Sequence, residues 1–253
     1  MNYLQHINNI LVLSIVTIFV SFSAIGKENK TTKTHDSPTK LHVQERLLFI
    51  GDSHSVGIFG RSLTEILHQN FPHIALTAVA SCGSEPRWWL EGKATNCGLL
   101  THEANGTEEK VLKGNTPKLQ ELLSAIKPKM TIVALGSNLV LMSEEDRKSY
   151  TEKMMTMVEK KSSQCIWISA PDSRKFKTSD IDDVYMLLKK LSKSHHCKLI
   201  DSRKYTKYPS SGGDGLHYGG QEGALIATQW AEKVFIGIKP ALSKSFKHHH
   251  IPN

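Results

Sequence analysis

Three residues that together can carry out acyl transfer occur at two distant places in this chain: Ser53 near the start, and Asp214 and His217 near the end. A serine hydroxyl becomes a nucleophile when a histidine takes its proton and a carboxylate orients that histidine. Asp214 and His217 are three residues apart, so one tight turn can place the carboxylate on Nδ1 of the ring while Nε2 faces the serine. The sequence therefore holds the components of a serine-nucleophile site.

Ser53 lies in the segment GDSHS (51–55), directly after the apolar run 47–50. A buried strand that stops here would hold the hydroxyl on a sharp strand-to-helix turn at the edge of a sheet. Another interpretation of Ser53 remains open, namely that it only caps the following helix. For His54 three positions are open: in contact with substrate, behind the site, or facing solvent. Asp52 is expected to shape the turn rather than to act chemically.

Five apolar segments alternate with five segments of helical periodicity. Continuous Val/Ile-rich runs are typical of strands buried on both faces, and their alternation with helices predicts parallel strands with right-handed crossovers. The fold class is therefore α/β, a three-layer α/β/α sandwich. The predicted strands are 47–51, 75–81, 130–136, 165–170 and 198–201, and the predicted helices are 55–69, 116–126, 143–162, 179–195 and 219–234. Residues 83–115 form one long irregular insertion, and such loops often line a site.

Binding sites in such sheets form beyond the carboxyl ends of the strands. Ser53 follows the first predicted strand, Gly83 the second and Asn138 the third, whereas Asp214 and His217 precede the last helix. A tetrahedral oxyanion needs hydrogen-bond donors. The backbone N–H groups of Ser53 and Gly83 and the side-chain amide of Asn138 are donors that three of these loops can supply.

In their order along the chain, these segments resemble the SGNH (GDSL-type) serine esterase family over about residues 46–235. GDSHS matches its first block, Gly83 the second, Gly136 with Asn138 the third, and Asp214 with His217 the last. The resemblance implies a flavodoxin-like fold whose five-stranded parallel sheet has the order 2-1-3-4-5, and an enzyme without a cofactor.

The resemblance also implies a role for each matched residue. Ser53 would be the nucleophile, His217 the general base and acid, and Asp214 its orienter. The oxyanion hole would consist of Ser53, Gly83 and Asn138. One departure is that many members have Asp directly after the third-block asparagine, whereas this chain has Leu139. The family pattern therefore does not indicate which contacts fix the loop that carries Asn138.

The two ends of the chain differ from its centre. Residues 1–26 contain no Lys, Arg, Asp or Glu and include the apolar run 10–25, which is typical of a secretory signal peptide; an uncleaved anchor is the alternative, although the run is short for a membrane span of about 20 residues. We expect a flexible spacer over 27–45, the hydrolase domain over 46–236, a basic C-terminal tail over 237–253, and no stable membrane span after signal removal.

Four cysteines in an exported chain predict two disulfides, for which three pairings are possible. We favour Cys82–Cys97 and Cys165–Cys197, because each cysteine of the second pair opens an apolar run and would lie at the same end of neighbouring strands. No CxxC or HExxH spacing occurs, so a metal site is not expected.

Charge and aromatic residues bear on the partners. The formal net charge of +8 fits either a well-solvated exported protein or attraction to an anionic envelope polymer. Nucleic acid is disfavoured, because no basic stretch is interleaved with aromatics. In the 83–115 insertion, Trp88 and Trp89 beside Arg87 could form a platform for a sugar ring or could pack within the loop.

The expected protein is a periplasmic or secreted serine esterase that acts through an acyl-enzyme. Its expected substrate is an O-acetyl ester on a cell-envelope carbohydrate such as peptidoglycan. The enzyme alternatives are a lysophospholipase, a lipase or thioesterase, and a glycan O-acetyltransferase. A hypothesis from another class is a catalytically weak carbohydrate-binding protein with the same fold.

Overall fold

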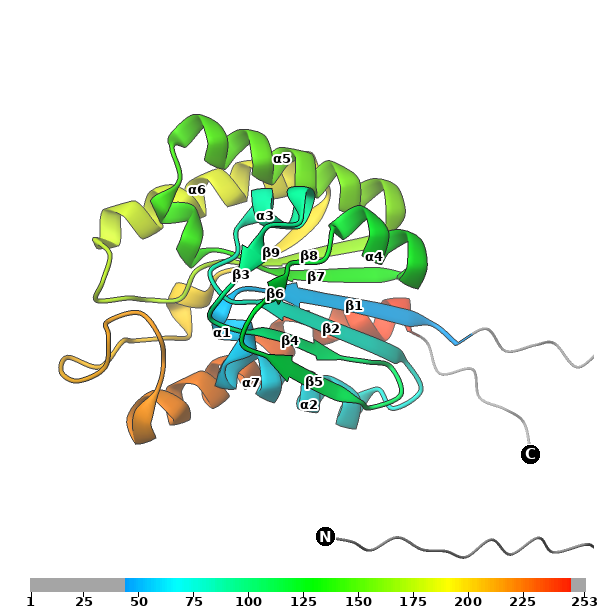
Figure 1. The fold of residues 1–253 in the computed structure, drawn as a ribbon, viewed down its shortest axis with the longest axis horizontal. Coiled ribbons are helices and arrows are strands. Elements are labelled where there is room, and N and C mark those ends of the chain that lie inside the picture. The colour runs from blue at the N-terminus through cyan, green and yellow to red at the C-terminus, as the bar shows by residue number, and fades with distance from the viewer. Residues whose placement is uncertain (1–43, 247–253) are drawn as a thin grey trace, which may run out of the picture. The chain divides into compact units, whose positions relative to one another are not determined.

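The computed structural model describes residues 44–246, and in this part of the chain a seven-stranded sheet lies between two layers of helices (Figure 1). The strand order is β5-β4-β2-β1-β7-β8-β9. The strands of this sheet are β1 (Arg46–Gly51), β2 (Ala75–Ser81), β4 (Leu99–His102), β5 (Glu108–Val111), β7 (Met130–Ala134), β8 (Gln164–Ile168) and β9 (Cys197–Ile200). The α/β class and the sandwich architecture are as predicted.

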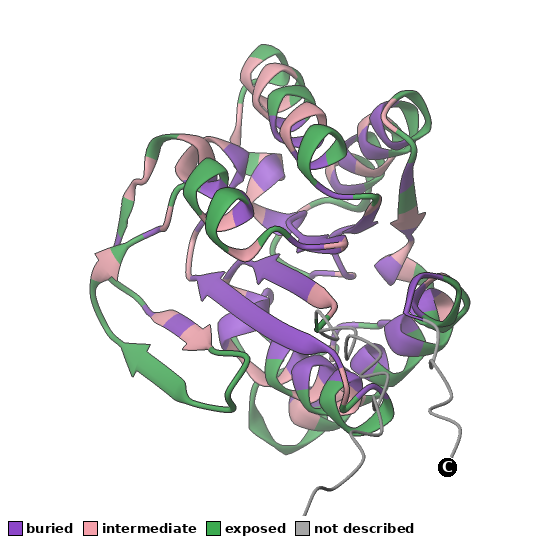
Figure 2. Ribbon diagram, turned by 90° about the vertical axis from the view of Figure 1, so that its right-hand side faces the viewer, coloured by how far each residue is buried: buried purple, intermediate pink, exposed green. Residues whose placement is uncertain are grey.

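The parallel part of the sheet is β2-β1-β7-β8-β9. Numbered by chain order among themselves, these five strands have the predicted order 2-1-3-4-5. Every residue of β2 and β7 is buried, because helices cover both faces of the sheet (Figure 2). The continuous apolar runs in the sequence therefore correspond to strands that are buried on both sides.

The insertion 83–115 is not irregular, so that part of the prediction was wrong. It contains helix α3 (Pro86–Glu91), a short pair made by β3 (Ala94–Thr95) and β6 (Gly114–Asn115), and the hairpin β4–β5. The hairpin pairs antiparallel with β2 and turns the expected five-stranded parallel sheet into a mixed seven-stranded one. All four residues of β5 are exposed, so the hairpin lacks the apolar pattern by which the other strands were predicted.

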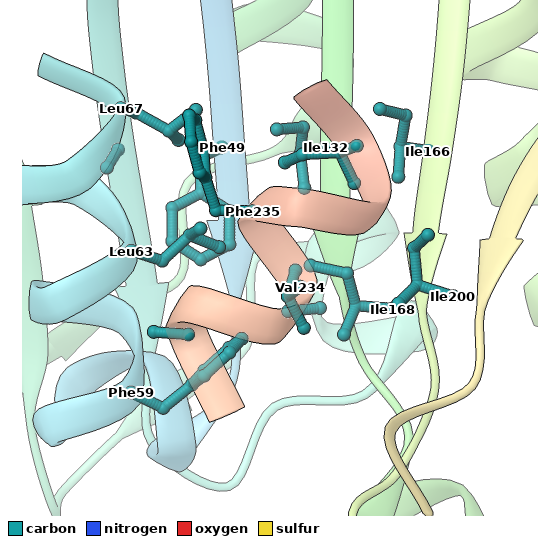
Figure 3. Packing of buried hydrophobic residues seen from close by; sticks show 14 of the residues in the cluster. Phe49, Phe59, Leu63, Leu67, Ile132, Ile166, Ile168, Ile200, Val234 and Phe235 are labelled. Carbon is teal, nitrogen blue, oxygen red and sulfur yellow. The ribbon is translucent and has the colours of Figure 1, made fainter. Parts of the chain in front are cut away.

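Two apolar clusters hold the layers together. On one face of the sheet, α2 and α7 pack through side chains such as Phe59, Leu63 and Val234 (Figure 3). On the other face, α4, α5 and α6 pack through side chains such as Leu123 and Val158. The helices are α1 (Ser53–Val56), α2 (Ile58–Asn70), α4 (Leu119–Ile126), α5 (Glu144–Lys161), α6 (Thr178–Ser194) and α7 (Gly220–Ser245).

Helix α7 extends well beyond residue 236, where we expected the domain to end and a basic tail to begin. Ile238, Leu242 and Phe246 are at most 1% exposed. They continue the buried stripe of the helix at a spacing of four residues, which outweighs the missing backbone N–H of Pro240. Residues 237–246 therefore belong to the folded domain.

Both disulfides have the pairing that we favoured, Cys82–Cys97 and Cys165–Cys197. The second joins residues that lie opposite each other in β8 and β9. Among residues 44–246, no helix is long and apolar enough to cross a membrane, and no group of three or more His, Cys, Asp or Glu side chains could hold a metal ion. The predicted signal peptide, the predicted spacer up to residue 43 and residues 247–253 of the predicted tail lie outside the described residues.

Candidate active site

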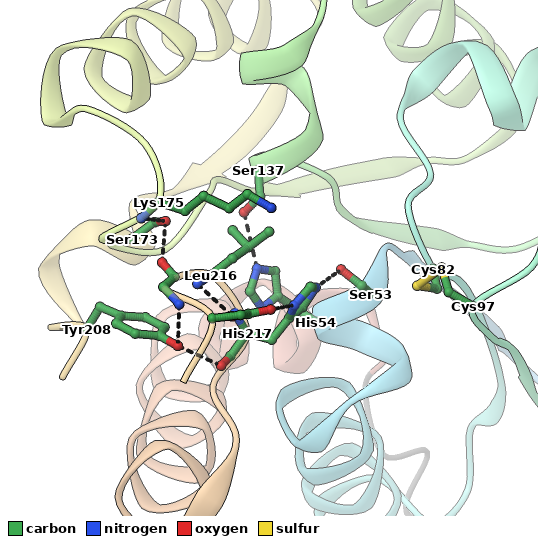
Figure 4. A network of polar contacts seen from close by, with 12 residues as sticks. Ser53, His54, Cys82, Cys97, Ser137, Ser173, Lys175, Tyr208, Leu216 and His217 are labelled. Atoms are coloured by element: carbon green, nitrogen blue, oxygen red, sulfur yellow. Dashed lines mark hydrogen bonds and ion pairs between the residues drawn. A yellow bond between two sulfur atoms is a disulfide. The ribbon is translucent and has the colours of Figure 1, made fainter. Parts of the chain in front are cut away.

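Ser53, His217 and Asp214 meet in the structure, although 164 residues separate the serine from the histidine. Ser53 is the first residue of α1, directly beyond β1. Nε2 of His217 lies 2.9 Å from Oγ of Ser53 (Figure 4). Nδ1 of the same ring lies 2.6 Å from Oδ2 of Asp214. This is the geometry in which an imidazole can take the proton of a hydroxyl while a carboxylate fixes its tautomer.

The electrostatics of the Asp214 carboxylate suit an orienting role. Partial burial alone would raise its pKa, but it accepts hydrogen bonds from the ring and backbone N–H of His217 and from the backbone N–H of Leu216. Together these bonds hold the pKa of Asp214 well below its ordinary value. The carboxylate therefore stays ionised at any working pH and keeps a proton on Nδ1 of the histidine.

The loop that carries Asp214 and His217 has little regular structure and is fixed from behind by residues that the sequence did not reveal. The hydroxyl of Tyr208 donates to the carbonyl oxygen of His217 at 3.0 Å and accepts from the backbone N–H of Gly215 at 3.1 Å. The Gly215 carbonyl accepts from Ser173 Oγ and from two backbone N–H groups of the facing loop. No motif marks Tyr208, because its role depends on how two loops meet.

The other two predicted oxyanion donors, Gly83 and Asn138, line one cavity of about 260 Å³. Gly83 has a φ of +81°, a conformation that favours glycine. Asn138 lies in the 3-10 helix η1 (Ser137–Leu141), and its Nδ2 donates to the backbone oxygen of Ser84 at 2.9 Å. An amide nitrogen carries two hydrogens, so one remains for a ligand. Ser53 is not among the residues that line this cavity.

Gly136 explains how η1 comes so close to the end of β8. A Cβ atom at Gly136 would lie 2.1 Å from the backbone nitrogen of Ala170, so no other residue fits without moving the chain. A close approach of two backbones therefore requires glycine at position 136, two residues before Asn138.

The three tentative substrate residues separate in the structure. Arg87 and Trp88 line the 260 Å³ cavity, together with Glu85, which forms an ion pair with Arg87 at 3.3 Å. Trp89 is 0% exposed, and its Nε1 donates to Ser84 Oγ at 3.0 Å. The prediction that Trp89 contacts substrate is therefore wrong. Neighbouring positions on α3 point about 100° apart, so only one tryptophan can face the cavity.

Two titratable residues are buried behind the nucleophile. Asp52 is 2% exposed and caps α1 by accepting from the backbone N–H of His54 at 3.0 Å. Burial raises the pKa of Asp52 to about 7 and lowers the pKa of His54 to about 3. In the folded protein both groups are thus neutral in mildly acidic solution, whereas in the unfolded chain Asp52 is ionised and His54 is protonated.

These opposite shifts predict opposite changes in two variants. From about pH 4 to 6.5 the folded pair holds one proton on Asp52 and the unfolded pair holds one on His54, so the pair adds no pH dependence to stability. In Asp52→Asn, only the unfolded state binds the His54 proton, so the free energy of unfolding should increase as the pH is raised from about 3 to 6.5. In His54→Leu, only the folded state binds the Asp52 proton, so the free energy of unfolding should decrease as the pH is raised from about 4 to 7. Either slope can reach roughly 1.4 kcal/mol per pH unit.

Urea unfolding of the two variants and the wild-type protein at several pH values measures these slopes. The difference from the wild-type slope is the relevant quantity, because the other titratable groups contribute equally to all three proteins. Equal slopes in all three would show that the two groups are not buried as neutral species.

The disulfides offer a matched pair of variants. Cys82 directly precedes Gly83, and Sγ of Cys97 lies 3.9 Å from where a Cβ of Gly83 would be. Replacing Cys82 and Cys97 by serine should lower stability by about 3 kcal/mol. It should also lower kcat about tenfold, because the loop that carries Gly83 is then no longer held by the disulfide. Replacing Cys165 and Cys197 should lower stability alone. Equal kcat in both double variants, measured below their melting temperatures, would contradict this role.

The order of the five parallel strands is the one that the resemblance to the SGNH family implies. The sequence matches no protein-family model and no curated protein. Among solved structures, TesA aligns with a TM-score of 0.58 over 78% of this chain and 99% of that chain, at 14% identity.

Two further structures match over similar lengths. A catalytic mutant of Axe2, an acetylxylan esterase from Geobacillus stearothermophilus, aligns with a TM-score of 0.51 over 77% of this chain and 94% of that chain, at 13% identity. The lipase/acylhydrolase from Enterococcus faecalis aligns with a TM-score of 0.51 over 75% of this chain and 95% of that chain, at 14% identity. The likeness to these three structures covers most of this chain and concerns its fold.

Proposed function

We propose that this protein is an exported serine esterase that uses Ser53, His217 and Asp214 as a catalytic triad. The observation that carries the proposal is the chain of contacts from Ser53 Oγ through both nitrogens of His217 to the Asp214 carboxylate. The export proposal rests on the signal-like residues 1–26 and on the two disulfides, which persist in oxidising compartments.

In the first half of the reaction, Ser53 Oγ attacks the carbonyl carbon of the ester and its proton passes to Nε2 of His217. The oxyanion formed accepts hydrogen bonds from the backbone N–H groups of Ser53 and Gly83 and from the free amide hydrogen of Asn138. When the C–O bond to the alcohol breaks, His217 returns the proton to the leaving oxygen, and the acyl group remains on Ser53.

In the second half, a water molecule loses a proton to His217 and attacks the acyl-enzyme. Collapse of the second tetrahedral intermediate releases the carboxylic acid, and the proton returns to Ser53. Asp214 stabilises the imidazolium that forms in each half without itself taking a proton.

We further propose that the substrate is an acetyl ester on an envelope glycan. The 260 Å³ cavity beside Gly83 and Asn138 is small and has a mixed lining, in which Glu85, Arg87 and Asp146 are charged. Trp88 adds one aromatic surface of the kind that sugar rings pack against. A long acyl chain would need a larger apolar groove, which disfavours the lysophospholipase and thioesterase alternatives. The net charge of +8 fits an anionic polymer.

Release of acetate from O-acetylated peptidoglycan by the purified protein tests the substrate. We expect acetate release, a p-nitrophenyl acetate kcat/KM at least about tenfold above that of the decanoate ester, and little acetyl transfer to added glycan. Trp88→Ala should raise KM for the glycan about three- to tenfold and leave p-nitrophenyl acetate hydrolysis unchanged. Cleavage of long-chain esters without any acetate release would contradict the glycan substrate while leaving the esterase in place.

A further inference from the structure

One hydrogen bond links the turn that carries the nucleophile to the loop that carries Asn138. His54 follows Ser53 on α1, and its Nε2 lies 3.2 Å from Oγ of Ser137, the residue that directly precedes Asn138. The two partners are 83 residues apart in the chain. In Figure 4 the bond spans the gap between α1 and η1. The side chains next to the nucleophile and next to the amide donor are thus tied to each other.

His54 is enclosed, so it does not reach a substrate. It is 6% exposed, and the rings of His217 and Trp230 lie 5.5 Å and 5.6 Å from its ring centre. The space beside it is a cavity of about 10 Å³, also lined by Asp52 and Ser137. Such a volume has room for about one water molecule and for no part of an ester.

The His54 ring is also suited to lie beside a histidine that changes its charge. Burial lowers the pKa of His54 to about 3, so the ring remains uncharged where His217 acts as a base. A second cation at this distance would oppose the imidazolium that His217 forms on taking the proton of Ser53. An uncharged imidazole can hold the loop without that penalty.

The loop that carries Asn138 needs a hydrogen bond of this kind, because the side chain of Leu139 cannot form one. Where many SGNH proteins have a carboxylate after the asparagine, Leu139 is 0% exposed and belongs to the apolar cluster under α5 and α6. The Asn138 amide is held on one side by the Ser84 carbonyl. Within residues 44–246, the side chain of Ser137 makes its hydrogen bond with His54.

We propose that His54 is a positioning residue, which through its hydrogen bond to Ser137 fixes the distance between the Ser53 nucleophile and the Asn138 oxyanion donor. This role rests on the proposed function, because it concerns the same site. The proposed role gives a function to His54 of the GDSHS segment, a residue that is not part of the triad.

Kinetics of four variants test the role in the full-length protein. His54→Leu and Ser137→Ala each break the bond and should lower kcat for p-nitrophenyl acetate about tenfold with little change in KM, because the displaced donor interacts with the oxyanion only in the transition state. The double variant should be no slower than either single one. His54→Gln, whose amide can reach the place of Nε2, should recover most of the rate. His68→Leu, an exposed histidine on α2, is the control and should keep wild-type kinetics.

A second readout does not depend on turnover. In the Ser53→Ala background, His54→Leu should shift the NMR signal of the Asn138 side-chain amide, and His68→Leu should leave it unchanged. Additive rate losses in the double variant, or an unmoved Asn138 signal, would overturn the role of His54. If the wild-type protein hydrolyses no ester, the proposed function fails, and the Asn138 signal alone then decides whether His54 couples α1 to η1.

Discussion

Replacement of Ser53 by alanine is expected to lower kcat for ester hydrolysis on the order of 10⁴-fold or more. In the proposed mechanism the hydroxyl forms the bond to the acyl carbon, and neither His217, 2.9 Å away, nor the oxyanion donors can replace it. Hydrolysis of p-nitrophenyl acetate measures the loss. A fluorophosphonate should label the wild-type protein at Ser53 and leave the variant unlabelled.

The same substitution should leave stability almost unchanged, which separates a chemical from a structural role. The side chain that caps α1 is that of Asp52, not Ser53, so alanine at position 53 removes no helix cap. Equal thermal midpoints of wild type and variant are therefore expected. A large drop in stability with activity retained would favour a structural serine, and a wild-type protein that no fluorophosphonate labels would favour the carbohydrate-binding alternative.

The histidine should behave as one unit with the serine. His217→Ala is expected to lose as much rate as Ser53→Ala, and the double variant no more than either, because each change disables the same step. Asp214→Asn should cost less, on the order of 10²- to 10⁴-fold, since it disturbs the tautomer of His217 but leaves the nucleophile and base in place. If the losses of rate were additive in the Ser53 and His217 double variant, the two residues would not act in the same step.

The second large effect is expected at Asn138. Asn138→Ala should lower kcat about 10²- to 10³-fold with little change in KM, because its free amide hydrogen meets the oxygen only when that oxygen becomes negatively charged. Steady-state kinetics with p-nitrophenyl acetate checks the split between the two constants.

Asn138→Asp is the matched variant, because the side chain keeps its size and loses its donors. It should be at least as slow as Asn138→Ala, since a carboxylate would repel the developing oxyanion. If KM rises in both variants while kcat is kept, Asn138 binds the ester in its ground state and the assignment to the oxyanion hole is incorrect.

The sequence predicted the parallel core because the five buried strands carry their signal locally. Each is a short apolar run between helical segments, and buried parallel strands need just that pattern. The hairpin β4–β5 escaped prediction because β5 is a charged, exposed edge strand, where polar residues suit the solvent. The end of α7 was placed too early, because the basic composition masked the buried positions of Ile238 and Leu242.

For the candidate site, the sequence could indicate only those contacts whose geometry is local. Asp214 and His217 are joined by one turn, so their spacing alone indicated the pairing. The separation of Trp88 from Trp89 depends on how α3 is rotated against the sheet, and a doublet of identical residues carries no information about that. Tyr208 and His54 make contacts between segments that are far apart in sequence, and no single segment encodes such contacts.

The proposed catalytic pair is open to solvent, since the side chains of Asp214 and His217 are 52% and 46% exposed. A molecule much larger than the cavity can therefore lie across these residues while only its acyl group approaches Ser53. No chain end has to be threaded into a chamber, and a polymer could be processed at internal positions along its length. Such exposure suits an enzyme that works on a material too large to be engulfed.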